Sequence, residues 1–161
     1  MRVIIVGKDK ELLEPLIDKL TFEGFEAVWI KNSDGVRSYM KKAGINFLVA
    51  DSALLVDRGL GREVHKHWPL ARLVGLSANP SRLGLVEALS EGLIDYFPRT
   101  PEYYDHVVDL IVSERSRIRR WQRELMSDSF VAEPLDGDRQ EALDDEDSGS
   151  EDIFGESDGI S

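Results

Sequence analysis

The feature that most constrains the fold is a regular alternation of short apolar runs and amphipathic segments along the first 125 residues. The apolar runs are Val3–Val6, Ala27–Ile30, Phe47–Ala50, Leu73–Leu76 and Leu93–Phe97. Runs of this length, rich in branched side chains, predict strands, and the segments between them have helical spacing. Successive strands start about 20 to 25 residues apart, which suits βαβ crossovers and leaves no room for hairpins. The pattern predicts an α/β, doubly wound, five-stranded parallel sheet, with the first, third and fourth strands buried on both faces.

Capping residues and prolines mark the expected ends of the helices. Candidate N-cap residues stand before the first, second, fourth and fifth helical segments: Asp9, Ser33, Asn79 and Thr100. Asn79 and Thr100 are each followed by a proline, the residue favoured at the first helical position. Pro15 lies inside the first segment and should distort or cap its early turns. The third segment, Gly61–Trp68, is short because Pro69 stops it.

The last helical segment is unusually long. Helical spacing continues from Pro101 to Leu125 without a further glycine or proline. At 1.5 Å per residue, about 25 residues make a rod of roughly 37 Å, so its last turns should project from a domain of this size. Apolar residues recur there at intervals of seven: Tyr104, Ile111, Ile118 and Leu125. This stripe, with Trp121 near its end, predicts packing on a second copy or on a partner helix.

Arginines crowd the end of the same segment: Arg115, Arg117, Arg119, Arg120 and Arg123. Arginine at helical spacing can neutralise phosphates, so nucleic-acid binding is an alternative reading of this segment. It is the weaker one, because the rest of the domain is close to neutral and an acidic segment follows directly. We therefore expect the arginines to flank a protein-contact surface, with Arg115, Arg119 and Arg123 among its residues.

Charge divides the chain at Leu125. Residues 126–161 hold thirteen of the 31 acidic residues and one of the 20 basic residues, a net charge of −12, whereas residues 1–125 have a net charge of +1. Such an acidic, apolar-poor composition predicts a disordered tail after the folded domain of residues 1–125. Within it, Ile153 and Phe154 could form a short docking motif that orders on a partner. The plainer alternative is a solvated tail that promotes solubility.

Composition excludes several classes of function. The chain has no cysteine, which rules out disulfides, cysteine nucleophiles and thiolate metal sites. No apolar run approaches the roughly 20 residues of a membrane helix, so we expect a cytoplasmic protein without a membrane partner.

In an open parallel sheet, chemistry gathers where the strands end, so the residues that follow the apolar runs carry the functional prediction. They are Gly7, Lys8, Asp9, Asp51, Ser77 and Arg99. Asp51 follows the third run and has Gly59 eight residues on, Leu76-Ser77-Ala78 ends the fourth, and Asp95-Tyr96-Phe97 forms the fifth. With this spacing, residues 2 to about 112 resemble the receiver domain of bacterial two-component response regulators, whose fold is flavodoxin-like.

The resemblance implies a role for each matching position. Asp51 corresponds to the aspartate that accepts a phosphoryl group from a histidine kinase, Ser77 to the switch hydroxyl and Tyr96 to the switch aromatic. It also implies contact through the fourth helical segment, the fifth strand and the start of the long last helical segment, a face that here includes Leu83, Glu87 and Tyr96. A receiver is a signalling module, and we expect no enzyme activity.

Three departures from the family pattern point to an atypical receiver, or pseudo-receiver. The two carboxylates that hold Mg²⁺ in the family are replaced by Gly7 and Lys8, and Asp9 stands one place too late. The family's lysine is replaced by Arg99. Phosphoryl transfer to a carboxylate relies on a divalent cation, and Mg²⁺ binds through carboxylates and water.

We therefore expect no metal or other cofactor. The Lys8 ammonium, together with Arg99, is expected to pair with Asp51 and lock it in an ion pair. The function predicted is a signalling module that binds partner proteins independently of phosphorylation and could form a homodimer through its last helix. The alternative is a conventional phosphorelay receiver, phosphorylated on Asp51 with weakly held Mg²⁺.

Overall fold

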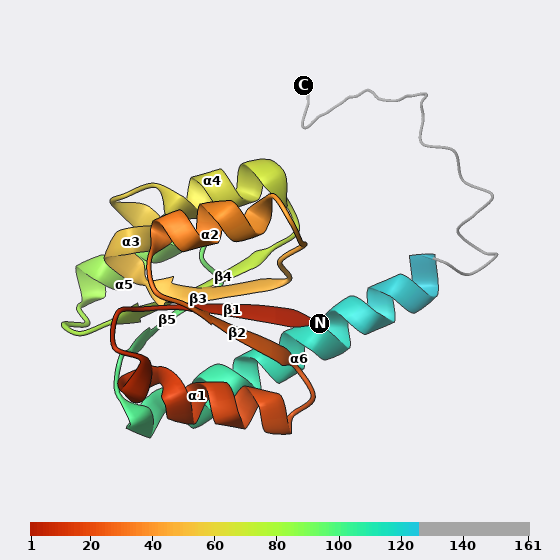
Figure 1. Cartoon of the computed structure of the whole chain (residues 1–161), viewed down its shortest axis with the longest axis horizontal. Coiled ribbons are helices and arrows are strands. Elements are labelled where there is room, and N and C mark those ends of the chain that lie inside the picture. Colours follow the sequence, from red (N-terminus) through yellow and green to blue (C-terminus); the bar gives the residue numbers. More distant parts are fainter. Residues whose placement is uncertain (126–161) are drawn as a thin grey trace. The chain divides into compact units, whose positions relative to one another are not determined.

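The computed structural model describes residues 1–125 and consists there of a parallel sheet between two layers of helices (Figure 1). The strands are β1 (Arg2–Val6), β2 (Glu26–Ile30), β3 (Phe47–Asp51), β4 (Arg72–Ser77) and β5 (Asp95–Pro98). The helices are α1 (Lys10–Phe22), α2 (Ser33–Met40), α3 (Ser52–Val56), α4 (Leu60–His67), α5 (Arg82–Ser90) and α6 (Tyr104–Leu125), with a 3₁₀ turn at Pro101–Tyr103. The compact body is Met1–Arg115, and α6 continues from it into a second unit that begins at Ser116.

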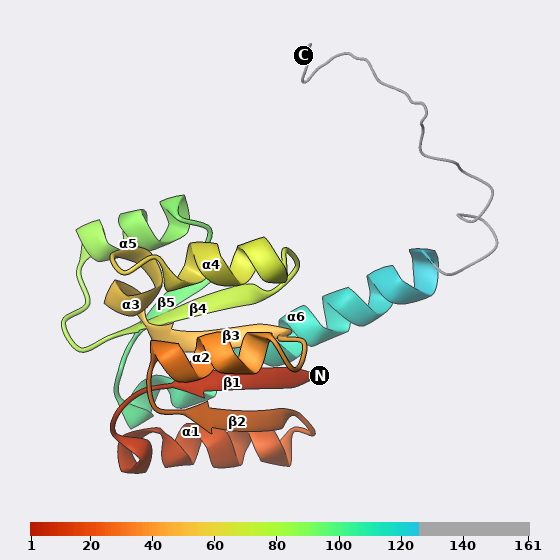
Figure 2. The ribbon, with the colours of Figure 1, turned by 45° about the horizontal axis from the view of Figure 1, so that its top comes forward.

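The sheet of the described chain has the order β2-β1-β3-β4-β5, and every pair of neighbours is parallel. This is the doubly wound order in which the strand sequence reverses between β1 and β3, so a crevice forms at the carboxyl ends of those two strands. Helices α2 to α5 lie on one side of the sheet and α1 lies on the other with the start of α6 (Figures 1 and 2). The predicted fold class is confirmed.

The core lies on both faces of the three central strands. Four of the five residues of β1 and of β3, and four of the six of β4, are buried. Apolar side chains on both faces explain why these strands read as continuous apolar runs in the sequence. The expected burial of the first, third and fourth strands is thus confirmed.

Helix ends were predicted with mixed success. Asp9 caps α1 as expected, accepting a hydrogen bond from the Leu12 N–H at 3.2 Å, and α1 runs on through Pro15. The expected cap at Asn79 is wrong. The cap of α5 is Ser81, whose Oγ accepts from the Gly84 N–H at 3.0 Å, because α5 begins only at Arg82. The Asn79 backbone N–H donates to the Ser77 hydroxyl.

The other helix starts differ from expectation by small shifts. Asn32, rather than Ser33, is the N-cap of α2, and it accepts from the Gly35 N–H at 2.9 Å. Thr100 precedes a proline as expected, but the turn that follows is 3₁₀ before α6 begins. Of the helices within residues 1–125, none combines the length and apolarity needed to cross a bilayer.

Candidate functional site

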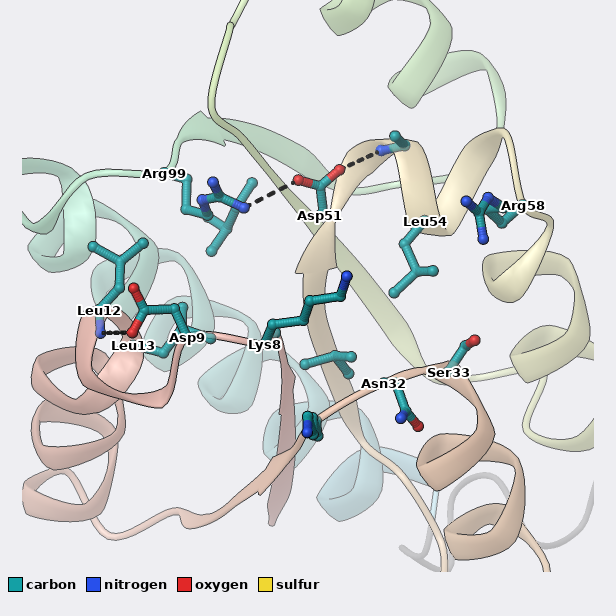
Figure 3. A pocket seen from close by; sticks show the side chains of 15 residues that line it. Lys8, Asp9, Leu12, Leu13, Asn32, Ser33, Asp51, Leu54, Arg58 and Arg99 are labelled. Atoms are coloured by element: carbon teal, nitrogen blue, oxygen red, sulfur yellow. Dashed lines mark hydrogen bonds and ion pairs between the residues drawn. The ribbon is translucent and has the colours of Figure 1, made fainter.

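A pocket of about 540 Å³ opens at the carboxyl ends of β1 and β3 (Figure 3). It is bounded by the β1–α1 loop, the start of α2, the β3–α3 turn and the residue that follows β5. Its lining consists of Val6, Gly7, Lys8, Asp9, Leu12, Leu13, Lys31, Asn32, Ser33, Asp51, Ala53, Leu54, Arg58, Leu76 and Arg99. The fold therefore brings together five of the predicted site residues: Gly7, Lys8, Asp9, Asp51 and Arg99.

Both carboxylate oxygens of Asp51 have partners. Oδ1 accepts a hydrogen bond from the Ala53 N–H at 2.9 Å, which makes Asp51 the N-cap of α3. Oδ2 lies 3.4 Å from Nη1 of Arg99, and each side chain of this pair is 37% exposed. The contact is longer than a strong charge-assisted hydrogen bond and is partly screened by solvent. It positions the two groups but adds little stability.

The expected pairing of Lys8 with Asp51 is wrong. In Figure 3, Lys8 extends from the end of β1 toward Leu54 and Asp51, yet the ion pair of Asp51 is drawn to Arg99 alone. Within residues 1–125, Lys8 forms no ion pair with any carboxylate. Arg99, rather than Lys8, pairs with Asp51. Its backbone N–H donates to the Ser77 carbonyl at 2.7 Å as the chain leaves β5, and this places the Arg99 side chain near the end of β3.

Gly7 lies against the side chain of Leu13. A Cβ atom at this position would lie 2.6 Å from Cδ1 of Leu13, a buried residue of α1. The Gly7 carbonyl also accepts a hydrogen bond from the Trp29 indole N–H at 2.9 Å. A carboxylate side chain therefore has no room at position 7 unless Leu13 moves.

These residues do not fit a magnesium site. Of the two carboxylates in the pocket, Asp9 caps α1 and Asp51 is held by Arg99 and Ala53. Lys8 adds an ammonium group where oxygen ligands would be needed. In the described part of the chain, no three acidic, histidine or cysteine residues gather closely enough to hold a metal ion.

Ser77 and Tyr96 lie beside the pocket rather than in its lining. The Ser77 Oγ accepts from the Asn79 N–H at 3.1 Å, and the Tyr96 hydroxyl accepts from the Ser81 N–H at 3.1 Å. A Cβ on Gly84 would meet the Tyr96 oxygen at 2.5 Å, so the ring rests against the first turn of α5. Tyr96 thus connects β5 to the start of α5, and Ser77 contacts the loop that precedes this helix.

No protein-family model matches the sequence, and the comparison with curated proteins finds no match. Solved structures do match. A response regulator from Thermotoga maritima aligns with a TM-score of 0.63 at 18% identity, over 70% of this chain and 94% of that one. HP1043, an orphan response regulator of H. pylori, aligns with a TM-score of 0.62 at 20% identity, over 70% and 94%.

A third match is an atypical orphan response regulator, with a TM-score of 0.55, 20% identity, and coverage of 68% of this chain and 93% of that one. Identities this low establish the fold alone. The chain has the receiver fold. Its structural neighbours are receiver domains of response regulators, proteins of two-component signalling.

The receiver face that includes α5 carries exposed apolar side chains. Leu83, Val86 and Leu89 are 67%, 55% and 49% exposed. They recur every three residues along one side of α5, which forms an apolar stripe on the surface. We call these three residues the α5 stripe. The sequence prediction had named Leu83 and the exposed Glu87 for this face.

The four apolar residues that recur at intervals of seven along α6 do not form a single contact surface. Tyr104 and Ile111 are fully buried within the Met1–Arg115 body, so only the second half of the predicted stripe remains accessible. Burial raises the pKa of the Tyr104 hydroxyl, which donates a hydrogen bond to the Leu12 carbonyl at 2.9 Å. Heptad spacing alone does not distinguish a helix that packs on its own domain from one that packs on a partner helix, because both arrangements bury the same face.

Arg115 forms contacts within the domain. Its Nη1 donates to the Glu23 carbonyl at 2.6 Å and its guanidinium lies 4.3 Å from the centre of the Phe25 ring. These contacts join α6 to the end of α1. A role for Arg115 in binding a partner stays a prediction.

The remaining predicted contact residues stay predictions. Trp121 and Leu125 are exposed, as are Arg119 and Arg123, and Ile118 is half-buried. Ile153 and Phe154, with the tail of residues 126–161 for which disorder is expected, lie outside the described residues.

Sequence reasoning missed a buried ion pair between Arg72 and Glu114. Arg72 Nε lies 2.8 Å from Glu114 Oε1, and their side chains are 16% and 9% exposed. The pair links the start of β4 to α6. A signal was present, because Glu114 follows the buried Ile111 by three residues and therefore lies on the inner side of α6.

Proposed function

We propose that this chain is an atypical receiver that signals through protein contacts without phosphorylation of Asp51. The observation that carries the proposal is the Asp51–Arg99 ion pair, combined with the use of the other Asp51 oxygen as the cap of α3. A phosphoacceptor must present a carboxylate oxygen to the incoming phosphorus. Here one oxygen of Asp51 caps α3 and the other lies against the Arg99 guanidinium, so an incoming phosphoryl group would meet an arginine rather than a metal ion.

The charges around Asp51 support the same reading. Catalysis of phosphoryl transfer depends on cations that neutralise the phosphoryl oxygens and position them for attack. The residues at this site do not fit Mg²⁺, and a carboxylate side chain at position 7 would have to displace the Leu13 side chain. One structural neighbour is described as an atypical orphan response regulator with a phosphorylation-independent regulatory mechanism. By analogy, this chain would also act without the phosphoryl group.

Response regulator receivers interact with signalling proteins, and the α5 stripe is the contact surface we propose for this one. Its three side chains are each at least 49% exposed, although burying a leucine or valine stabilises by about 1.5–3 kcal/mol. The Tyr96 hydroxyl and Ser81 N–H join the stripe's helix to β5. A partner protein bound to α5 would thus be coupled to β5 through this hydrogen bond.

Phosphoryl transfer is tested directly by mass spectrometry. The full chain is incubated with Mg²⁺ and acetyl phosphate, beside a receiver that has an intact acid pair as a positive control for the donor. We expect no added phosphoryl group on this chain while the control is modified. A modification that is present on the wild type and lost in Asp51→Asn would instead establish a conventional phosphorelay receiver.

Metal affinity is tested by titration. Lys8→Asp places a second carboxylate beside Asp9 and should raise Mg²⁺ affinity above that of the wild type. Lys42→Asp introduces the same change at an exposed lysine outside the pocket and serves as the matched control. Tight Mg²⁺ binding by the wild type would contradict the proposed function.

A further inference from the structure

The pocket beside Asp51 carries an excess of positive charge. Four cationic side chains line it, Lys8, Lys31, Arg58 and Arg99, against the two carboxylates of Asp9 and Asp51. Its formal charge is therefore +2 when all six groups are ionised. A pocket with this balance repels metal ions and attracts anions.

The cations and carboxylates differ in how they are engaged. Asp9 caps α1 and Asp51 is held by Ala53 and Arg99, so both carboxylates are already used inside the fold. In contrast, Lys8, Lys31 and Arg58 are exposed and form no ion pair with any carboxylate of residues 1–125. Three cations thus face the pocket with their charges uncompensated by nearby side chains.

These cations surround the opening from different elements. Figure 3 shows Lys8 reaching from the end of β1 and Arg58 on the other side of α3 from Arg99. Lys31 and the start of α2 complete the rim. The helix start adds a partial positive charge in the same direction. An anion in the pocket could therefore be contacted from more than one side.

The inner wall of the pocket is apolar. Val6, Leu12, Leu13, Leu54 and Leu76 contribute to it. A volume of about 540 Å³ falls within the roughly 300–1,000 Å³ of small-molecule sites, which combine apolar walls with a few polar groups. The charge suits an anionic head group, and the leucines suit an apolar body attached to it.

We propose that this pocket binds a small organic dianion with an apolar body, and that Lys8, Lys31 and Arg58 hold the anionic head group without a metal ion. A dianion matches the excess of two positive charges, whereas a monoanion leaves half of it uncompensated. The head group is either a phosphate-type group or a pair of carboxylates. The inference rests on the proposed function only in that the site holds no Mg²⁺.

Isothermal titration calorimetry on the full chain, with a chelator present, tests the proposal using three aromatic probes. Phenylphosphonate carries one doubly charged head group above its second pKa, phthalate carries two adjacent carboxylates, and benzoate is the monoanion on the same ring. We expect saturable binding of phenylphosphonate or phthalate that is at least about tenfold tighter than that of benzoate, since a charge-assisted hydrogen bond contributes about 1.5–3 kcal/mol. Which dianion binds identifies the head group.

Variants decide whether the binding is in this pocket. Lys8→Gln and Arg58→Gln should each weaken the dianion about tenfold or more, and because both residues are exposed the variants should fold. Lys42→Gln removes one charge outside the pocket and should leave affinity unchanged. The proposal is overturned if no probe saturates, if benzoate binds as tightly as the dianions, if added Mg²⁺ is required, or if Lys42→Gln weakens binding as much as Lys8→Gln.

This outcome is separable from the test of the proposed function. Phenylphosphonate has a carbon–phosphorus bond and cannot donate a phosphoryl group, so its binding is reversible and leaves the mass of the chain unchanged. The acetyl phosphate experiment reads a covalent change at Asp51. Either result can therefore fail while the other stands.

Discussion

The closure of position 7 by Leu13 predicts that even one added methyl group is costly there. In Gly7→Ala, the new Cβ would lie 2.6 Å from the Leu13 Cδ1, whereas carbon atoms in favourable contact are about 3.5–4.0 Å apart. One of them must move by about an ångström, and the side chain of Leu13, which is buried but also lines the pocket, is the part that can give way. Overpacking of this kind costs about 1–3 kcal/mol, which is the expected loss in the free energy of unfolding.

A double-mutant cycle isolates the contact responsible. Leu13→Ala alone should cost about 2–5 kcal/mol, because it empties a buried leucine site. It also removes Cδ1, so adding Gly7→Ala in that background should cost close to nothing. The double variant should therefore be more stable than the sum of the single effects implies, by about 1–3 kcal/mol.

Urea unfolding followed by circular dichroism measures all four proteins, with unchanged m-values required for the comparison. Gly44→Ala is the matched control, because a Cβ at Gly44 meets its nearest neighbour, Trp68, at an ordinary 3.4 Å. We expect it to change stability far less than Gly7→Ala does. Strict additivity of the two mutations would refute the reasoning, since it would mean that Leu13 does not close position 7.

Three further predictions concern the body and the tail. Glu114→Ala removes the carboxylate that contacts the Arg72 Nε and should lower the free energy of unfolding by about 3 kcal/mol or more, with a smaller loss in Glu114→Gln; equal losses in urea unfolding would contradict this. Burial raises the pKa of Tyr104 above its unfolded value of about 10, so the contribution of its neutral hydroxyl to stability is present below that pH and is lost as pH rises through the folded value. The melting temperature of Tyr104→Phe should therefore decline less at alkaline pH than that of the wild type. Identical declines would exclude Tyr104 as the cause. Removal of residues 126–161, with their net charge of −12, should increase self-association more strongly at low than at high salt in sedimentation experiments, and equal behaviour at both salts would leave the tail a solubility segment.

The strands and the doubly wound class of the sheet were accessible from the sequence because they depend on patterns that many residues share. Runs such as Phe47–Ala50 are apolar at every position, and this requires burial on both faces whatever the neighbours are. The position of Asp51 at the end of such a run then placed it at the carboxyl edge of the sheet. The absence of an acid pair at Gly7 and Lys8 was likewise visible from residue types alone.

The partners of individual side chains were not accessible in this way. Choosing Arg99 over Lys8 as the partner of Asp51 depends on how the chain leaves β5, where the Arg99 N–H binds the Ser77 carbonyl. The cap of α5 is Ser81 rather than Asn79, because the helix begins only at Arg82. The choice of Arg99 joins residues that are 48 positions apart in the sequence.

The apolar residues of α6 also show what a local sequence pattern cannot determine. The sequence by itself determined that Tyr104, Ile111, Ile118 and Leu125 share one face of a helix, since that follows from 3.6 residues per turn. Only the tertiary structure decided that Tyr104 and Ile111 are used by the domain's own core. Helical periodicity records which side chains avoid water, and a domain core and a partner protein satisfy that requirement equally well. The choice between them depends on where the surrounding elements lie in space, which no local pattern encodes.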